Sequence, residues 1–180
     1  MRDSTGGVIA ASTQEATGGD AAAFVALVEP LLPAAYRLAV AMLRSDTDAE
    51  DAVQEATLKA WRHFGRFRRE AAMKPWLLAI VANECRRMRR SRWFWVIKSS
   101  EAIDVEDRVR PEVHALRADL RRALHRLPHD QRLVVILRYY LDLSFDEVAE
   151  VMRISTKAAK SRTYRALERL RLSPEVLADE

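Results

Sequence analysis

Residues 127–171 read LPHDQRLVVILRYYLDLSFDEVAEVMRISTKAAKSRTYRALERLR, and this stretch decides the fold of the C-terminal part of the chain. Ser144 and Glu147 form the S-x-x-E pattern of a capping box, which predicts a short apolar helix after Ser144. Ser155 can cap a second helix that runs to about Arg171. Two helices joined by a turn of roughly three or four residues predict a helix-turn-helix.

The second predicted helix has two chemically different faces when its residues are placed at about 100° steps. The inward face holds Ala159, Thr163, Ala166, Leu167 and Leu170. The outward face holds Lys157, Lys160, Ser161, Tyr164 and Glu168, with Arg165 beside them. Cations, a hydroxyl and an aromatic ring suit DNA phosphates and base edges. A solvated basic face is the alternative for this helix alone, but the capped partner helix at the right spacing favours DNA binding.

The composition limits the classes of protein to which the chain can belong. The chain has 180 residues, of which 49% are hydrophobic and 31% charged, with a net charge of +4. This length suits one domain or two small ones, and the composition excludes a wholly disordered chain and a membrane core. We expect no apolar run near the roughly 18–20 residues that span a bilayer. The first residues lack the apolar core of a signal peptide. The prediction is a cytoplasmic protein without membrane insertion.

The chain offers little for metal or redox chemistry. Cys85 is the only cysteine, so neither an internal disulfide nor a cysteine-based zinc site can be completed. Its helical spacing with Ile80, Val81 and Met88 predicts a small buried hydrophobe. The four histidines show no metal-ligand spacing. We therefore predict no metal, no cofactor and no catalytic residues.

Helical periodicity covers most of the chain, and almost nothing is typical of a strand. We predict an all-α protein of two small helical domains joined by a flexible linker, the second domain containing the helix-turn-helix. The predicted divisions are a disordered tail at 1–19, a domain at 20–92, the linker at 93–111, a domain at 112–172 and a tail at 173–180.

Local signals place the helices inside these domains. The first predicted helix runs from Asp20 to about Leu43 and is interrupted by two prolines. Thr47 and Glu50 suggest a capping box that opens a helix through Phe64. The expected inward residues of that helix are Ala49, Ala52, Val53, Ala56, Ala60 and Trp61. Pro75 suits the first turn of a helix that continues to about Arg92. In the second domain, Val113, Leu116, Leu120, Ala123, Leu124 and Leu127 are expected on one helical face, and Pro128 begins the next helix.

These motifs together resemble a known family. The first domain carries DAEDAVQE at 48–55, Ala60-Trp61, Phe64, Pro75-Trp76-Leu77 and Ile80-Val81-Ala82-Asn83. The second carries Leu127-Pro128, Gln131-Arg132, LSFDEVA at 143–149, Lys160-Ser161-Arg162 and Arg165-Ala166. In this order they resemble the extracytoplasmic-function (ECF) sigma factors of bacterial RNA polymerase, which have two domains, regions 2 and 4.

The resemblance implies roles for the first domain. Asp48, Asp51, Gln54 and Glu55 would bind core RNA polymerase, although helix capping and solubility also favour anions there. A loop at about 66–74 would capture a base flipped out of the melted −10 element. Its residues Phe67, Arg68, Arg69 and Lys74 offer a stacking face and phosphate partners. Asn83 matches a position near that base, but a buried polar role is equally compatible. Trp61 and Trp76 are expected in the core.

The resemblance also implies that the second domain reads the −35 element as duplex DNA. The matching positions are Lys157, Lys160, Ser161, Arg162, Tyr164 and Arg165. Arg162 lies at the flank of the helical wheel, so a backbone contact or a packing role competes for it. Arg153 stands where relatives usually place glycine, and Lys157-Ala158-Ala159 replaces the usual Gly-Thr-Val. These departures bear on the −35 sequence rather than on the fold.

The family implies a non-enzymatic promoter-specificity subunit whose partners are core RNA polymerase, promoter DNA and an anti-sigma factor. Trp93–Ile97 is an apolar run that suits either such a partner or packing on the preceding helix. One alternative is a conventional helix-turn-helix regulator with a non-sigma N-terminal domain. Another is an enzyme acting on nucleic acid, which would need a carboxylate cluster for Mg²⁺ that the sequence lacks.

Overall fold

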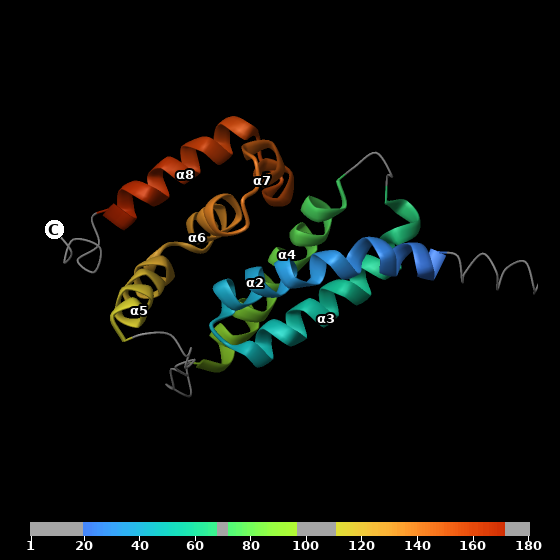
Figure 1. Ribbon diagram of the computed structural model, residues 1–180, viewed down its shortest axis with the longest axis horizontal. Helices are drawn as coiled ribbons and strands as arrows, with labels where there is room; N and C mark the ends of the chain where they lie inside the picture. The colour runs from blue at the N-terminus through green and yellow to red at the C-terminus, as the bar shows by residue number, and fades with distance from the viewer. Residues whose placement is uncertain (1–19, 68–71, 97–110, 172–180) are drawn as a thin grey trace, which may run out of the picture.

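The computed structural model describes residues 20–67, 72–96 and 111–171, and within these ranges every regular element is helical. The N-terminal half comprises a helix at residues 20–28, the 3₁₀ turn η1 (Glu29–Leu31), α2 (Leu32–Leu43), α3 (Asp46–His63), the 3₁₀ turn η2 (Phe64–Arg66) and α4 (Met73–Val96). The C-terminal half comprises α5 (Pro111–Arg126), α6 (His129–Val135), the π-helical segment η3 (Ile136–Tyr140), α7 (Phe145–Met152) and α8 (Thr156–Arg171), as Figure 1 shows. The predicted all-α fold is confirmed.

Helix α3 buries a row of alanines against its neighbours. Ala49, Ala52, Ala56 and Ala60 are all fully buried, so the helices of this half can approach closely. Two details of the prediction are wrong. The N-cap is Ser45, whose hydroxyl accepts a hydrogen bond from the backbone N–H of Asp48, and not Thr47. Trp61, expected to point inward, remains 37% exposed because it lies at the edge of the bundle against Phe24.

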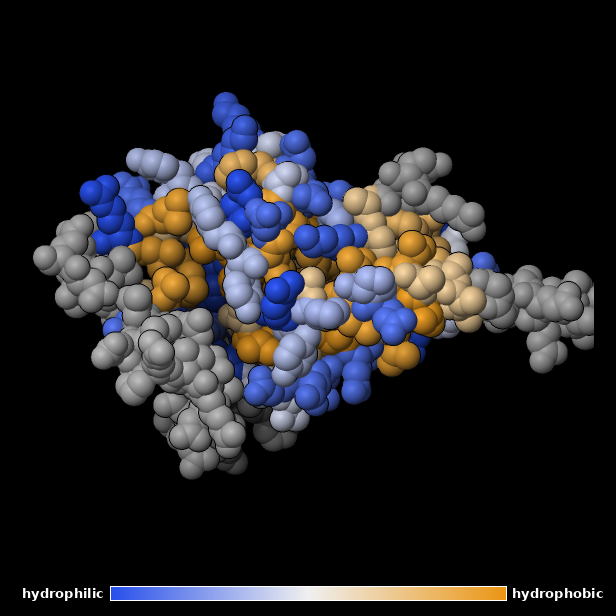
Figure 2. All heavy atoms as spheres, viewed as in Figure 1, coloured by the Kyte–Doolittle hydropathy of each residue, from blue (hydrophilic) through white to orange (hydrophobic). Residues whose placement is uncertain are grey.

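The stretch Asp20–Leu43 is long and apolar enough to cross a membrane by length and composition alone, contrary to our expectation. Its structure is that of a core element. The 3₁₀ turn η1 interrupts it at Pro30, and Phe24, Val28 and Leu38 are buried against the rest of the N-terminal half. Apolar side chains also remain on its surface, including Val25 and Leu27. Figure 2 shows hydrophobic residues gathered at the surface around the end of the molecule where residues 20–28 lie.

Helix α4 is longer than predicted. It continues through Val96, past the expected end near Arg92 and into the segment assigned to the linker, while Pro111 already belongs to α5. Cys85 is 1% exposed on its inward face, as expected, and burial raises the pKa of its thiol to about 12. The remaining linker residues 97–110 and the side chains of Trp93–Ile97 lie outside the part of the chain that the structure describes.

The C-terminal half contains the predicted helix-turn-helix. Ser144 and Glu147 make both hydrogen bonds of a capping box at the start of α7, and Ser155 accepts from the backbone N–H of Ala158 at the start of α8. Two apolar residues predicted to face inward are exposed, Leu120 on α5 and Leu167 on α8. The π-helical segment η3 was not predicted, since its apolar spacing does not distinguish it from an α-helix.

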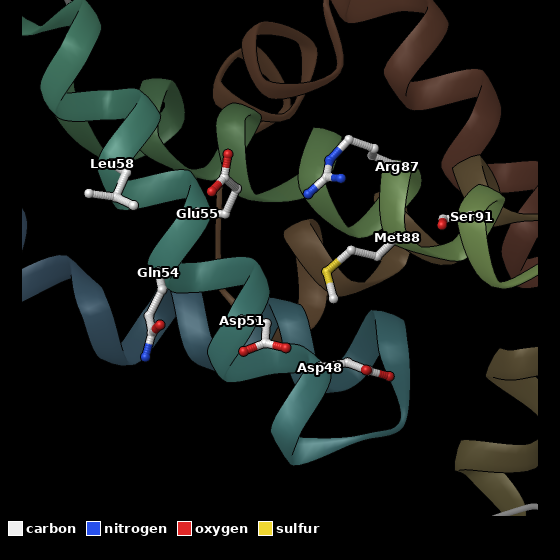
Figure 3. Close-up of a pocket in the computed structure, with 8 residues that line it drawn as sticks. All are labelled: Asp48, Asp51, Gln54, Glu55, Leu58, Arg87, Met88 and Ser91. Carbon is white, nitrogen blue, oxygen red and sulfur yellow. The ribbon is translucent and has the colours of Figure 1, made fainter.

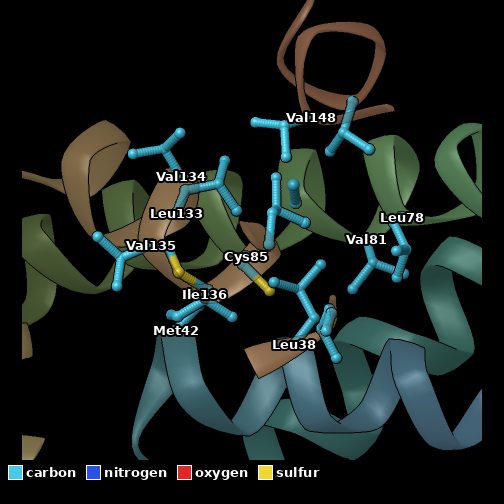
Figure 4. Close-up of a cluster of buried hydrophobic side chains, with 14 of the residues drawn as sticks. Leu38, Met42, Leu78, Val81, Cys85, Leu133, Val134, Val135, Ile136 and Val148 are labelled. Atoms are coloured by element: carbon cyan, nitrogen blue, oxygen red, sulfur yellow. The ribbon is translucent and has the colours of Figure 1, made fainter. Parts of the chain in front are cut away.

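The two halves, predicted as separate domains, pack against each other through one continuous apolar core. Leu38 and Met42 of α2 belong to the same buried cluster as Val81 of α4 and as Leu133 and Ile136 of the C-terminal half. Figure 4 shows these side chains converging from both halves. Burying a leucine-sized side chain contributes about 1.5–3 kcal/mol, so this shared core dominates the association of the halves.

Arg132 is a buried cation at the junction of the halves, with 6% of its surface exposed. Its guanidinium donates to the carbonyl oxygens of Leu124, His125 and Leu127 at distances of 2.7–3.3 Å. It also donates to the carbonyl of Met42 at the end of α2, at 3.3 Å. Burial, together with the charges of Arg89 and Arg44, lowers the pKa of Arg132 to about 10, so it remains charged at neutral pH.

We expect Arg132→Ala to destabilise the chain by about 3 kcal/mol, because it removes the guanidinium hydrogen bonds to four carbonyl oxygens at a buried site. Urea unfolding followed by circular dichroism measures the change. Arg122→Ala, which removes an exposed arginine from α5, is the control and should change stability by less than about 0.5 kcal/mol. Equal effects of the two substitutions would contradict this role for Arg132.

His125 gives the stability a defined pH dependence. Burial and the charges of Arg132, Arg44 and Arg121 lower its pKa to about 3. In the unfolded chain the imidazole has its ordinary pKa of 6.5, so the unfolded state binds the extra proton first. The folded state therefore loses stability as the pH falls below about 6.5. We expect His125→Gln to weaken this loss between pH 6.5 and about pH 5, where carboxylates still stay ionised. Urea unfolding at several pH values tests this, and identical pH slopes would refute it.

Candidate polymerase and nucleic-acid interfaces

A groove of about 420 Å³ runs between α3 and α4 on the N-terminal half. All four residues predicted to bind polymerase line it: Asp48, Asp51, Gln54 and Glu55. The other lining residues are Leu58 on α3 and Arg87, Met88 and Ser91 on α4. In Figure 3 the acidic and amide side chains project from successive turns of α3, and Met88 extends from α4 towards that helix. The groove therefore combines carboxylate and amide acceptors with an apolar strip from Leu58 and Met88.

A buried carboxylate that the sequence analysis did not identify organises one wall of the groove. Glu84 is 4% exposed, and Lys59 and Arg87 each donate to it at 2.7 Å. Burial alone raises the pKa of Glu84, but these hydrogen bonds outweigh it and hold that pKa below its usual value. Lys59 also lies 3.4 Å from Glu55. The spacing of Glu84 and Arg87 on one helix was the available sequence signal.

An aromatic row lies where the candidate −10 loop joins the helices. The ring of Phe67 is 4.9 Å from that of Trp76 and 6.4 Å from that of Phe64, with which it stacks. Phe24 packs edge-on against Phe64 and Trp61 at 5.2 Å each. Trp76 is half-buried in this row, which agrees with its predicted packing role, whereas Trp61 lies at the surface.

The candidate −10 residues lie in different surroundings. Asn83 is exposed on α4, so the alternative of a buried polar group is wrong for it, and its amide oxygen accepts from Arg86 at 3.1 Å. Lys74 donates to the backbone carbonyl of Leu141 in the C-terminal half at 3.3 Å. Phe67 belongs to the aromatic row. Arg68 and Arg69 lie outside the described residues.

Helix α7 ends with the C-cap residue Arg153, whose backbone has a left-handed conformation, and the turn to α8 follows. Arg153 has φ 53° and ψ 49°, the conformation in which helices commonly place glycine. Its backbone N–H donates to the carbonyl oxygens of Ala149 and Glu150, so the turn expected of a helix-turn-helix forms without glycine. Thr156 at the start of α8 donates to the Asp146 carboxylate at 2.7 Å, which ties the two helices together.

Helix α8 buries one face and exposes another. Ala159, Thr163, Ala166 and Leu170 are buried. Five of the six candidate −35 residues are exposed, namely Lys157, Lys160, Ser161, Tyr164 and Arg165. The ammonium of Lys160 lies 5.7 Å from the ring centre of Phe145, which holds the lysine near α7. Arg162 is the exception, because its guanidinium is 3.3 Å from the carboxylate of Asp130. Arg162 lies at the flank of the helical wheel, where a packing role competes with DNA contact, and its pair with Asp130 is a contact of the packing kind.

No group of three or more metal-ligating side chains occurs within the described ranges.

Two models of the sigma-70 family match the chain. The Sigma-70 region 2 model covers residues 27–94, and the Sigma-70 region 4 model covers residues 117–170. The first match includes the α3–α4 groove, and the second includes the helix-turn-helix. The chain is an ECF sigma factor of bacterial RNA polymerase. A helix-turn-helix regulator with a non-sigma N-terminal domain is thereby excluded.

Individual relatives agree with this assignment. The RNA polymerase sigma factor SigV of Bacillus subtilis is 31% identical over 137 residues, which are 76% of this chain and 82% of the relative. The ECF sigma factor SigM of Mycobacterium tuberculosis is 36% identical over 136 residues, 75% of this chain and 68% of the relative.

Solved structures share the arrangement of helices. The sigma factor RpoE of Bartonella quintana, solved in complex with the anti-sigma factor NepR, has a TM-score of 0.67 at 29% identity. That match covers 84% of this chain and 94% of RpoE. CnrH, solved in complex with the cytosolic domain of CnrY, has a TM-score of 0.67 at 25% identity, covering 92% of this chain and 94% of CnrH.

Arg153 yields a stability prediction for the helix-turn-helix. Arg153→Gly should stabilise the chain by about 0.5–1 kcal/mol, since relief of the left-handed strain exceeds the added flexibility of the unfolded chain. Thermal and urea unfolding measure it. Arg122→Gly, at a helical position of α5, should have the opposite sign because glycine weakens helix interiors. Destabilisation by Arg153→Gly would show that the Arg153 side chain contributes more than its backbone strain costs.

Proposed function

We propose that this sigma factor docks on core RNA polymerase through the α3–α4 groove, captures the melted −10 element with its N-terminal half and reads the −35 element with α8. The groove is the observation that carries the proposal. Its lining contains Asp48, Asp51, Gln54 and Glu55, the four residues that the family resemblance assigns to polymerase binding. A surface of carboxylates around an apolar strip suits a basic, partly apolar partner helix.

The solvent face of α8 supports reading of duplex DNA. Lys157 and Lys160 supply ammonium groups for phosphates, and Arg165 supplies a guanidinium that can bond guanine in the major groove. Tyr164 is 69% exposed, so its ring is available for contact with sugar or base. Because the opposite face is packed on α6 and α7, α8 presents these groups from a fixed support.

The N-terminal half supports capture of a flipped base. Phe67 offers an aromatic ring at the start of the candidate loop and is packed against Trp76 at 4.9 Å, and base stacking on aromatic rings contributes about 1–3 kcal/mol per base. The exposed amide of Asn83 can bond a base edge. Lys74, with Arg68 and Arg69 of the loop, supplies phosphate partners.

The same proposal covers location and restraint. A sigma factor acts where the polymerase acts, in the cytoplasm at the nucleoid. The solved complex of RpoE with the anti-sigma factor NepR supports a comparable anti-sigma partner for this chain.

The first test is promoter opening that depends on core polymerase. The purified chain is mixed with bacterial core RNA polymerase and a promoter library, and transcript starts and unpaired −10 bases are mapped. We expect starts that share upstream −35 and −10 sequences. Asp51→Arg plus Gln54→Ala should reduce these transcripts about tenfold or more, because the groove loses an anion and an amide acceptor.

Glu29→Arg is the matched control, since it makes the same charge change at an exposed site of the N-terminal half away from the groove. It should leave the transcripts at the wild-type level. Unchanged transcripts from the groove variant would reject the groove as the docking site. A chain that binds promoter duplex but yields no polymerase-dependent transcript starts and no unpaired −10 bases would reject the proposed function itself.

A further inference from the structure

Asp130 connects the two halves through its carboxylate. It lies in the first turn of α6, where its Oδ1 is 3.2 Å from a guanidinium nitrogen of Arg86 on α4. Its Oδ2 is 3.3 Å from a guanidinium nitrogen of Arg162 on α8. One anion therefore holds two arginines, each on a separate oxygen and each from a separate helix.

Both arginines lie at the candidate DNA surfaces, Arg162 as a candidate contact itself and Arg86 as a neighbour of one. Arg162 is one of the six candidate −35 residues on α8. Arg86 donates from its other terminal nitrogen to Asn83, the candidate −10 base contact, at 3.1 Å. The polar side chains Asn83, Arg86, Asp130 and Arg162 thus form a continuous series from the −10 surface to the −35 helix.

The Asp130 carboxylate is ionised, and other anions can compete with it for Arg86 and Arg162. Burial alone raises the pKa of Asp130, but its hydrogen bond with His129 and the charges of Arg86 and Arg162 outweigh that effect and hold the pKa below its usual value. The side chains of Arg86, Asp130 and Arg162 are 34%, 48% and 27% exposed, so an external anion can reach all three. A guanidinium bonds carboxylate and phosphate oxygens in the same way.

Stability does not account for this bridge. Ion pairs with side chains this exposed contribute little, whereas the shared apolar core already holds the halves together. The bridge instead determines which cations are available. In the compact chain, an arginine from each DNA surface is already neutralised.

We propose that the Asp130 carboxylate takes the place of a DNA phosphate, occupying Arg162 and Arg86 in the compact chain so that promoter DNA has to displace it. This inference rests on the proposed function for the role of the two surfaces. It assigns to Asp130 an effect opposite to that of a DNA contact: the wild-type carboxylate weakens DNA binding by the chain alone.

The test is duplex binding without polymerase, measured by fluorescence anisotropy on the full chain with a labelled promoter duplex. Asp130→Asn keeps the shape of the side chain and should tighten binding about threefold to tenfold. The gain should disappear in an Arg162→Gln background, because the arginine that Asp130 would release is then absent. Circular dichroism and urea unfolding establish that each variant remains folded.

Asp142→Asn controls for net charge. Asp142 pairs at 3.6 Å with Arg138 inside the C-terminal half, is 98% exposed and lies at φ 53°, a conformation that asparagine tolerates. The affinity of the Asp142→Asn chain for the labelled duplex should stay within about twofold of wild type. Equal gains from Asp130→Asn and Asp142→Asn would overturn the inference by reducing it to bulk charge. An unchanged or weaker affinity of a folded Asp130→Asn chain would also overturn it.

Different results would contradict the proposed function and the proposed role of Asp130. If Asp130→Asn tightens duplex binding through Arg162 but the chain yields no polymerase-dependent starts, the proposed function fails and the role of Asp130 stands. If the chain yields promoter-specific starts but Asp130→Asn binds duplex no better than wild type, the competitor role fails alone.

Discussion

The guanidinium of Arg132 needs four carbonyl oxygens, and these come from the end of α2 and from the α5–α6 junction. A buried cation is stable only where its donors are satisfied, so this requirement sets the position of α6 relative to α2. The apolar core supplies most of the favourable free energy of contact, but apolar contacts alone permit sliding. The directional bonds of Arg132 select one register. From that register follows the approach of α7 to α4 and the position of Asp130 between two arginines.

The candidate interfaces differ in how far the compact chain leaves them available. The α3–α4 groove and the outward face of α8 are open to solvent. Lys74 and Arg162, by contrast, already have partners in the C-terminal half. Under the proposed function, polymerase can therefore dock before the halves change their packing, whereas full engagement of promoter DNA requires the release of these cations. The energy needed for that release would come from the contacts made with polymerase and DNA.

Sequence reasoning predicted the helices and the helix-turn-helix because local signals define them: capping residues, prolines and apolar periodicity. It predicted the exposed face of α8 because that face lies on a single helix, where spacing determines direction, whereas the family resemblance indicated the residues that line the groove. It missed the contacts that join distant parts of the chain. Glu84, Asp130 and Arg132 each also bond a tertiary neighbour, 25, 44 and 90 positions away, which local spacing does not reveal. It also misplaced Trp61 and Leu120, since an apolar residue at a bundle edge has the same spacing as one in the core.

Cys85 has a consequence for how this protein responds to its surroundings. Burial raises the pKa of its thiol to about 12, so the thiolate is scarce at neutral pH, and the sulfur is enclosed by the shared core. Oxidants and electrophiles react with exposed thiolates, and the chain has no second cysteine. Oxidation of the folded sigma factor at its single thiol is therefore disfavoured. The same inertness makes a single cysteine introduced at the surface the one site that thiol-directed labels modify.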